Sequence, residues 1–189
     1  MKIIVYGSTN NKAYTDKQKQ DCEKLGKFLA SNKIDMLTGA CYGYPYFVGR
    51  ACVNNGGHVT GYSPAINLQE HTELYKFPTD GVSDLVFNAE KYKSKSESFM
   101  RRQIEQTKFA DVVIALGGSW GTFSELILSF MFQHTLILVE EYEGAVKAFT
   151  DVHKFFGERD YYPGVHHGAK IIKVKTVDEA MREIVKLNT

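Results

Sequence analysis

The sequence contains a glycine-rich turn, Gly117–Thr122, directly after the strongly apolar run Val112–Leu116. Glycines let backbone N–H groups approach an anion closely, and a helix that starts near Phe123 would direct its positive end to the same point. The hydroxyl of Thr122 can donate a further hydrogen bond or cap that helix. The turn therefore indicates a site for a phosphate group, and its candidate residues are Gly117, Gly118, Ser119, Gly121 and Thr122.

Two other expected strands also end in small residues. Gly7 and Ser8 follow the first strand, and Gly39 and Ala40 follow the second. Ligands of open parallel sheets bind outside the carboxyl ends of the strands, so we expect these residues to contribute to the same site. An isolated pair of glycines would be read as a simple turn between strand and helix. Three strand ends with matching chemistry favour a binding site.

Charged side chains accompany the glycine-rich turn. Glu125 lies four residues after Gly121, where its carboxylate can point into the cleft or simply stabilise the N-terminus of the helix. Arg101 and Arg102 lie on the preceding helix, and a planar guanidinium group suits a phosphate or a carboxylate. The two arginines could instead lie on a solvated helix face. Their spacing does not determine which of them faces the cleft.

Two common nucleotide-binding motifs do not occur in the sequence. The turn Gly117–Thr122 does not have the Gly-x-Gly-x-x-Gly pattern of dinucleotide-binding proteins. The Gly-x-x-x-x-Gly-Lys-Ser/Thr pattern of the ATP-hydrolysing proteins is also missing. These differences argue against a dinucleotide cofactor and against ATP hydrolysis.

Short β-branched runs alternate with helical stretches along the whole chain, which predicts a parallel sheet covered on both faces. With right-handed crossovers, the expected fold is a single α/β domain over residues 1–189, a doubly wound Rossmann-like parallel sheet of about seven strands with helices on both faces. The expected strands are Ile3–Tyr6, Ile34–Leu37, His58–Tyr62, Asp84–Asn88, Val112–Leu116, Thr135–Val139 and Lys170–Lys175. The expected helices are Asp16–Ser31 with Asp16 as N-cap, Pro45–Asn55, Ser94–Phe109, Phe123–Gln133, Gly144–Gly157 and Val177–Leu187, and Ser63–Gly81 is expected to be irregular.

Composition excludes several classes of protein. The chain has 189 residues with 23 Lys+Arg and 22 Asp+Glu, so its formal net charge of +1 gives no support to sequence-independent nucleic-acid binding. The longest apolar run, Leu126–Phe132, is too short to span a bilayer, and the chain opens on a strand that leaves no room for a signal peptide. We therefore expect a cytoplasmic protein without membrane or nucleic-acid partners.

Cysteine and histidine usage predicts neither disulfides nor a metal site. Cys22, Cys41 and Cys52 are too few and too scattered for either, and they are expected to be reduced thiols. No histidine partner is evident for Cys41 as a nucleophile. The pair His166 and His167 lies in an expected loop and is read as solvated, so no metal and no cofactor are expected.

The segment from Phe99 to Glu125 resembles the "Lonely guy" (LOG) family, whose older annotation is lysine-decarboxylase-like. That family has an arginine on a helix, then Ala-Asp and an apolar strand, then Pro-Gly-Gly-x-Gly-Thr-x-x-Glu. In this sequence Arg102 and Glu125 fall on the family's arginine and glutamate, while Leu116 replaces its proline and Gln103 replaces the lysine that usually follows the arginine. The alternating architecture extends the resemblance over nearly the whole chain.

The resemblance implies an N-glycosidase that releases a free base and ribose 5-phosphate from a nucleoside 5′-monophosphate. Glu125 could hold the ribose hydroxyls, stabilise the oxocarbenium charge or orient the attacking water, and Arg102 could orient the phosphate or assist the leaving base. The backbone of Gly39–Ala40 and of the turn Gly117–Thr122, with Ser8 nearby, would hold the phosphate. The alternative is a nucleotide-binding or cofactor-binding carrier or sensor without turnover, and lysine decarboxylation is rejected for want of a cofactor site.

Aromatic residues near the turns have two interpretations. Tyr42, Tyr44 and Tyr46 could stack on a base, or pack at a helix start or a dimer contact. Trp120 could cover the site or meet a partner subunit. Because LOG proteins are commonly dimers, the resemblance implies a homodimer or higher homo-oligomer.

Overall fold

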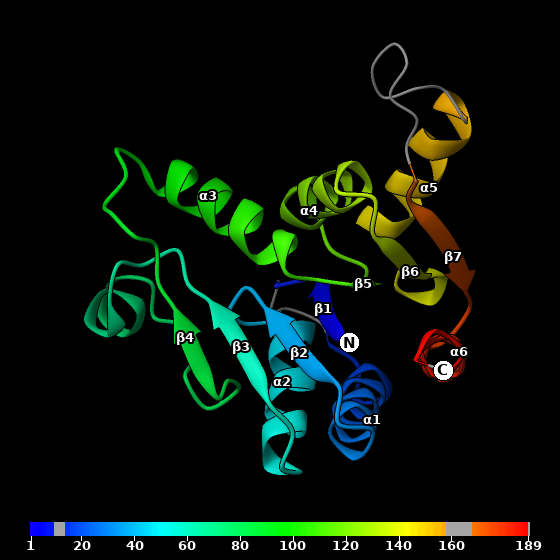
Figure 1. The fold of residues 1–189 in the computed structure, drawn as a ribbon, viewed down its shortest axis with the longest axis horizontal. Coiled ribbons are helices and arrows are strands. Elements are labelled where there is room, and N and C mark those ends of the chain that lie inside the picture. The colour runs from blue at the N-terminus through cyan, green and yellow to red at the C-terminus, as the bar shows by residue number, and fades with distance from the viewer. Residues whose placement is uncertain (10–13, 158–167, 189) are drawn as a thin grey trace.

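The computed structural model describes residues 1–9, 14–157 and 168–188 and contains a seven-stranded sheet. The strand order is β4-β3-β2-β1-β5-β6-β7, and all neighbouring strands pair in parallel. The predicted α/β Rossmann-like fold is confirmed (Figure 1). The strands are β1 (Lys2–Gly7), β2 (Asp35–Thr38), β3 (Val59–Tyr62), β4 (Asp84–Val86), β5 (Val112–Leu116), β6 (Thr135–Val139) and β7 (Lys170–Val174).

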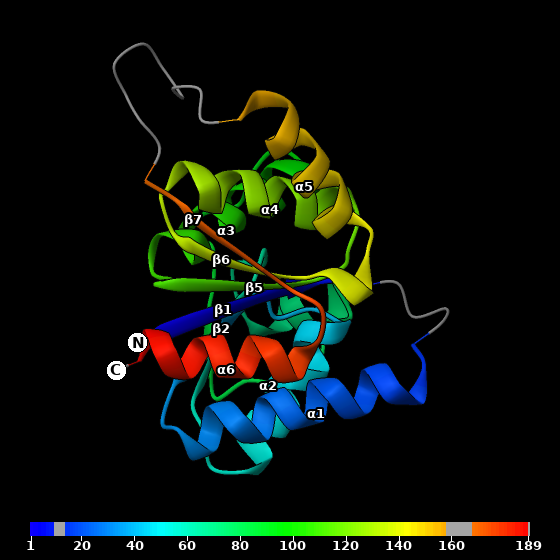
Figure 2. The ribbon, with the colours of Figure 1, turned by 90° about the vertical axis from the view of Figure 1, so that its right-hand side faces the viewer.

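Helices cover both faces of the sheet, as Figures 1 and 2 show. One layer consists of α1 (Asp16–Ser31), α2 (Tyr44–Asn54) and α6 (Val177–Leu187). The opposite layer consists of α3 (Lys95–Lys108), α4 (Trp120–Met131) and α5 (Ala145–Phe156). None of the helices in the described part of the chain is long and apolar enough to cross a membrane.

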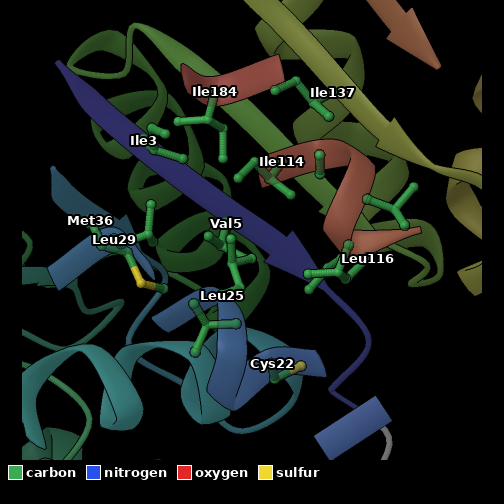
Figure 3. Packing of buried hydrophobic residues seen from close by; sticks show 14 of the residues in the cluster. Ile3, Val5, Cys22, Leu25, Leu29, Met36, Ile114, Leu116, Ile137 and Ile184 are labelled. Atoms are coloured by element: carbon green, nitrogen blue, oxygen red, sulfur yellow. The ribbon is translucent and has the colours of Figure 1, made fainter. Parts of the chain in front are cut away.

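The two faces of the central strands pack into separate apolar clusters. Ile3 and Val5 of β1 join the cluster under α1 and α2, while Ile4 and Tyr6 join the cluster on the other face. Figure 3 shows Val5 close to Leu25 of α1. Successive strand residues point to opposite faces, and a strand covered on both sides therefore has to be apolar at every position. This explains the continuous apolar runs in the sequence.

Strand order reverses between β1 and β5. The chain proceeds from β1 outward through β2 and β3 to β4, then returns through α3 to place β5 on the free side of β1. The register brings Gly7 opposite Leu116 at the carboxyl ends of these two strands. A reversal of this kind leaves a crevice beyond the strand ends, because the crossover helices depart to opposite faces of the sheet.

Beyond shifts of one or two residues at the ends of several elements, three local features differ from the sequence predictions. The N-cap of α1 is Thr15 and not Asp16, because the Thr15 hydroxyl accepts from the Gln18 N–H and the Gln18 side chain accepts from the Thr15 N–H. Helix α4 begins at Trp120, three residues before the predicted start. The segment predicted to be irregular contains a π-helical turn, Glu70–Leu74, whose residue His71 is buried.

We expect Thr15→Ala to lower the free energy of unfolding by about 1 kcal/mol, because it removes the hydroxyl that caps α1. Asp16→Ala is the matched control: Asp16 lies in the first turn and only its charge interacts with the helix, so the expected loss is smaller. Urea unfolding of both variants measures the difference. A larger loss for Asp16→Ala would mean that Asp16 is the residue that caps the helix.

Candidate functional site

A cavity of about 390 Å³ lies at the carboxyl ends of the central strands. Its volume is within the range of small-molecule sites. The structure brings seven of the predicted site residues together around it: Gly7, Gly39, Arg102, Ser119, Gly121, Thr122 and Glu125. They come from the ends of β1 and β2 and from helices α3 and α4, so four separate parts of the chain meet here.

A buried ion pair forms part of the cavity wall. Arg102 of α3 and Glu125 of α4 are 5% and 7% exposed, and Nη2 of Arg102 is 3.2 Å from Oε1 of Glu125. Nη1 of Arg102 donates to the backbone oxygen of Gly39 at 2.8 Å. Gln106, one turn further along α3, donates from Nε2 to the same Glu125 oxygen at 2.9 Å. The pair is therefore held in place by hydrogen bonds on both sides.

Gly39 is a glycine because the Arg102 guanidinium group lies against it. A Cβ atom at this position would be 2.5 Å from Nη1 and 2.9 Å from Cζ of Arg102. Any larger residue would therefore have to displace the guanidinium group from its hydrogen bond with the Gly39 backbone oxygen. The glycine at the end of β2 thus positions a side chain from a distant helix.

Burial dominates the electrostatics of the carboxyl group. Desolvation raises the pKa of Glu125 from its ordinary value of 4.5 to about 7, while the positive charge of Arg102 and the Gln106 hydrogen bond act in the opposite direction. Glu125 therefore changes its charge near neutral pH. A carboxyl group with such a pKa can both accept and donate a proton under physiological conditions.

The N-terminus of α4 forms another part of the wall. Gly118, with φ of 97°, turns the chain from β5 into the helix, and Ser119 in the N-cap position makes no side-chain capping bond. The Thr122 hydroxyl donates to the backbone oxygen of Gly7 at 3.2 Å, which ties the first turn of α4 to the end of β1. The first N–H groups of a helix have no partners within it, so this end of the cavity favours an anion.

Apolar and aromatic residues line much of the rest of the cavity, among them Val5, Tyr6, Tyr42, Pro45, Phe77 and Phe99. Phe77 follows the π-helical turn, and no pattern in the sequence indicated its role. Phe99 lies three residues before Arg102, and the Arg102 Cζ is 5.2 Å from the centre of its ring. That helical spacing is a signal from which Phe99 could have been inferred. Gln103 was noted in the sequence only as a departure from the LOG pattern, and it also lines the cavity.

Other predicted residues lie outside the cavity lining. Arg101 is exposed, and its Cζ is 5.5 Å from the centre of the Tyr92 ring. Ser8, Ala40, Gly117 and Gly118 lie in the adjoining turns and do not line the cavity.

The remaining candidates are also distributed around the site. Tyr44 is buried against Tyr14 and Tyr142, and Tyr46 donates to Asp80, so only Tyr42 of the three tyrosines lines the cavity. Trp120 is 84% exposed.

One of the three cysteines lines the cavity. Cys22 and Cys52 are buried free thiols, and Cys41 lines the cavity with a pKa that burial raises. His166 and His167 lie outside the described residues. Residues 1–9, 14–157 and 168–188 contain no cluster of three or more metal-ligating His, Cys, Asp or Glu side chains.

The fold and the glycine-rich strand end are those of a Rossmann-like α/β protein. More specifically, the model of the SLOG cluster4 family matches residues 1–181, and the chain belongs to that family. A comparison with curated proteins finds no match.

Solved structures share the fold over nearly the whole chain. The X-ray structure of TM1055 is 23% identical with a TM-score of 0.77, and the match covers 98% of each chain. The molybdenum cofactor binding protein from the phototrophic bacterium Rippkaea orientalis is 19% identical with a TM-score of 0.72, covering 100% of this chain and 97% of that one. DNA processing protein A from Helicobacter pylori is 16% identical with a TM-score of 0.65, covering 98% and 80%. At these identities the similarity concerns the fold alone.

The buried pair leads to a pH-dependent expectation for stability. Arg102→Leu removes the cation beside Glu125, so the folded-state pKa of Glu125 rises further above its unfolded value. A raised folded-state pKa gives stability that is complete below the unfolded value and is lost as pH rises through the folded value. We therefore expect a loss of about 3–5 kcal/mol at pH 8, and a clearly smaller loss at pH 5.

Urea unfolding at the two pH values measures this difference. The matched control is the double variant Arg102→Leu/Glu125→Gln, which removes the carboxylate as well and should lose most of the pH dependence. If the single variant lost the same free energy of unfolding at pH 5 and at pH 8, the raised folded-state pKa of Glu125 would be contradicted.

Proposed function

We propose that this protein hydrolyses the N-glycosidic bond of a nucleoside 5′-monophosphate and releases the free base and ribose 5-phosphate. The observation that carries the proposal is the buried Arg102–Glu125 pair in the wall of a cavity that also receives the N-terminus of α4. In such a cavity the N-terminus of α4 can bind an anionic group, and the carboxylate of Glu125 can stabilise a group that develops positive charge. The LOG-type resemblance supplies the reaction class.

The two ends of the cavity suit the two ends of a nucleotide. The first turn of α4, with Gly121 and Thr122, favours the phosphate, assisted by the backbone of Gly7 and Gly39. Tyr42, Phe77 and Phe99 offer aromatic surface to a planar base. Glu125 lies between these regions in the proposed binding mode and faces the ribose. Arg101 takes no part in this binding mode, because its guanidinium group lies over Tyr92.

The chemistry requires a carboxylate close to C1′. As the C1′–N bond breaks, its electron pair leaves with the base and the ribose acquires oxocarbenium character, which a carboxylate stabilises. Water then forms the new C1′–O bond and passes a proton to Glu125, while the departing base takes up a proton from the solvent. The pKa of about 7 allows Glu125 to accept that proton and to release it again at neutral pH. Arg102 holds the Glu125 carboxylate in position and balances its charge.

A second candidate is a carrier or sensor that binds a phosphorylated ligand without turnover. The similarity to the molybdenum cofactor binding protein, which extends over the full length of this chain, favours it. The same cavity would then hold a phosphorylated cofactor as cargo, and the ion pair would serve only to shape the wall. DNA processing protein A, one of the similar structures, binds single-stranded DNA. For this chain we favour a small ligand instead, because its formal net charge is only +1. The single domain, the homodimer, the cytoplasmic location and the lack of a metal stay predictions.

We expect purified protein to release free base and ribose 5-phosphate from at least one nucleoside 5′-monophosphate in a panel. Glu125→Gln should lower kcat by about 100-fold or more, because the amide can neither accept the proton nor stabilise the positive charge. The matched control is Glu105→Gln, which changes an exposed carboxylate on α3 that pairs with Lys108. Calorimetric binding of a nucleotide without release of base would reject the enzyme and support the carrier.

We expect kcat at saturating substrate to rise with pH, with a midpoint at or above about 7. The ionised form of Glu125 is the active one, and its pKa is raised to about 7 in the free protein. A bound phosphate dianion disfavours a second negative charge nearby and so moves the midpoint upward. Rate measurements from pH 5 to pH 9 provide the check. A flat or falling profile over that range would exclude the carboxylate as the group that assists the reaction.

A further inference from the structure

Gln106 of α3 is a fully buried amide that contacts the site from behind. It is 0% exposed and does not line the cavity. Its Nε2 donates to Oε1 of Glu125 at 2.9 Å, while its own Oε1 is buried without a hydrogen-bond partner among the described residues. A buried polar atom without a partner costs free energy, and an apolar residue of similar length would avoid that cost. The amide therefore needs a reason to be present.

The chemistry of a side-chain amide offers such a reason. An amide has a donor group and an acceptor atom at the same distance from the backbone, and rotation about its last bond exchanges them. In the orientation observed, the donor serves an ionised carboxylate. After rotation, the acceptor would serve a protonated carboxyl group, which needs a partner for its O–H. A lysine could serve only the first state, and a methionine neither.

Other groups around Glu125 cannot replace Gln106 in this role. From α3, Arg102 contributes a fixed positive charge and donors alone. From β1, burial and then the charge of Glu125 raise the pKa of the Tyr6 hydroxyl, but this hydroxyl hydrogen-bonds with Thr107. After β2, the Cys41 thiol interacts electrostatically with Glu125. Within α4, Ser129 donates to the backbone oxygen of Glu125 and not to its carboxyl group.

We propose that Gln106 is a positioning residue that holds the Glu125 carboxyl group in both of its charge states, donating from Nε2 to the carboxylate and, after rotation, accepting at Oε1 from the acid. The catalytic use of this arrangement rests on the proposed function, while the hydrogen bond itself does not. Glu125 can thereby gain and lose a proton without losing its place in the wall. Gln106 acts through Glu125 alone.

The test measures the pKa of Glu125 in the intact protein. A pH titration monitored by ¹³C NMR of glutamate-labelled protein gives this pKa, and the Glu125→Gln variant identifies the Glu125 signal. We expect Gln106→Met to raise that pKa by about one unit, because a hydrogen bond to a charged group is stronger than one to a neutral group. Gln106→Leu, which also removes the amide, should produce a rise in the same direction. Circular dichroism verifies the fold of each variant. An unchanged or lowered pKa in a folded variant overturns the proposal.

A matched control is Gln103→Met, which removes an amide of α3 that contacts Ser124 and the Gly121 backbone. In this variant the pKa of Glu125 should be the same as in the unmodified protein. A rise equal to that in Gln106→Met would show that loss of either amide on α3 raises the pKa, and it would overturn the specific role of Gln106. With a substrate available, Gln106→Met should lower kcat about five- to tenfold at pH 7 and by clearly less at pH 9, with little change in KM. Because the NMR titration needs no substrate, failure of turnover and failure of the Gln106 role are separate results.

Discussion

The parallel pairing of β1 with β5, from Ile3–Val112 to Gly7–Leu116, is the contact on which the site depends. These two strands are the point where strand order reverses, so the helices that follow them depart to opposite faces and leave the carboxyl ends of the strands accessible. Both strands are apolar because both of their faces are covered. Thr122 ties the start of α4 to Gly7, so a shift between the two strands would move the N-terminus of the helix relative to the cavity.

The second constraint is the cost of burying charge. Arg102 and Glu125 lose nearly all contact with water, and their mutual attraction offsets that cost only when further hydrogen bonds are formed. The Gly39 backbone and Gln106 supply them, and both require close approach between segments that are far apart in the sequence. Burial still prevails in the pKa of Glu125, which lies close to neutral. The hydrogen bonds that hold the pair and the raised pKa of Glu125 thus have the same physical origin, the burial of charge.

The cavity combines polar and aromatic surfaces in a way that suits a phosphorylated heterocyclic compound. Helix α4 provides positive electrostatic potential without a charged side chain, which suits an anion that has to be released again. The aromatic residues come from different segments, among them Tyr42 after β2 and Phe77 after the π-helical turn. An enzyme and a carrier could share this binding surface. The distinction between them lies in whether the carboxyl group of Glu125 reaches the bond that breaks.

The sequence by itself determined the α/β fold, the placement of most elements and the glycine-rich turn, because apolar periodicity and strand-end glycines are local properties of the chain. It misplaced the cap of α1, since Thr15 and Asp16 are both capping residue types and only the hydrogen bonds distinguish them. It also left open which arginine faces the cavity. Arg101 and Arg102 differ by one position on α3, and only the packing of that helix over the sheet buries one and exposes the other. The role of Gln106 and the raised pKa of Glu125 arise from contacts between helices and from exclusion of water, so only the tertiary structure decided them.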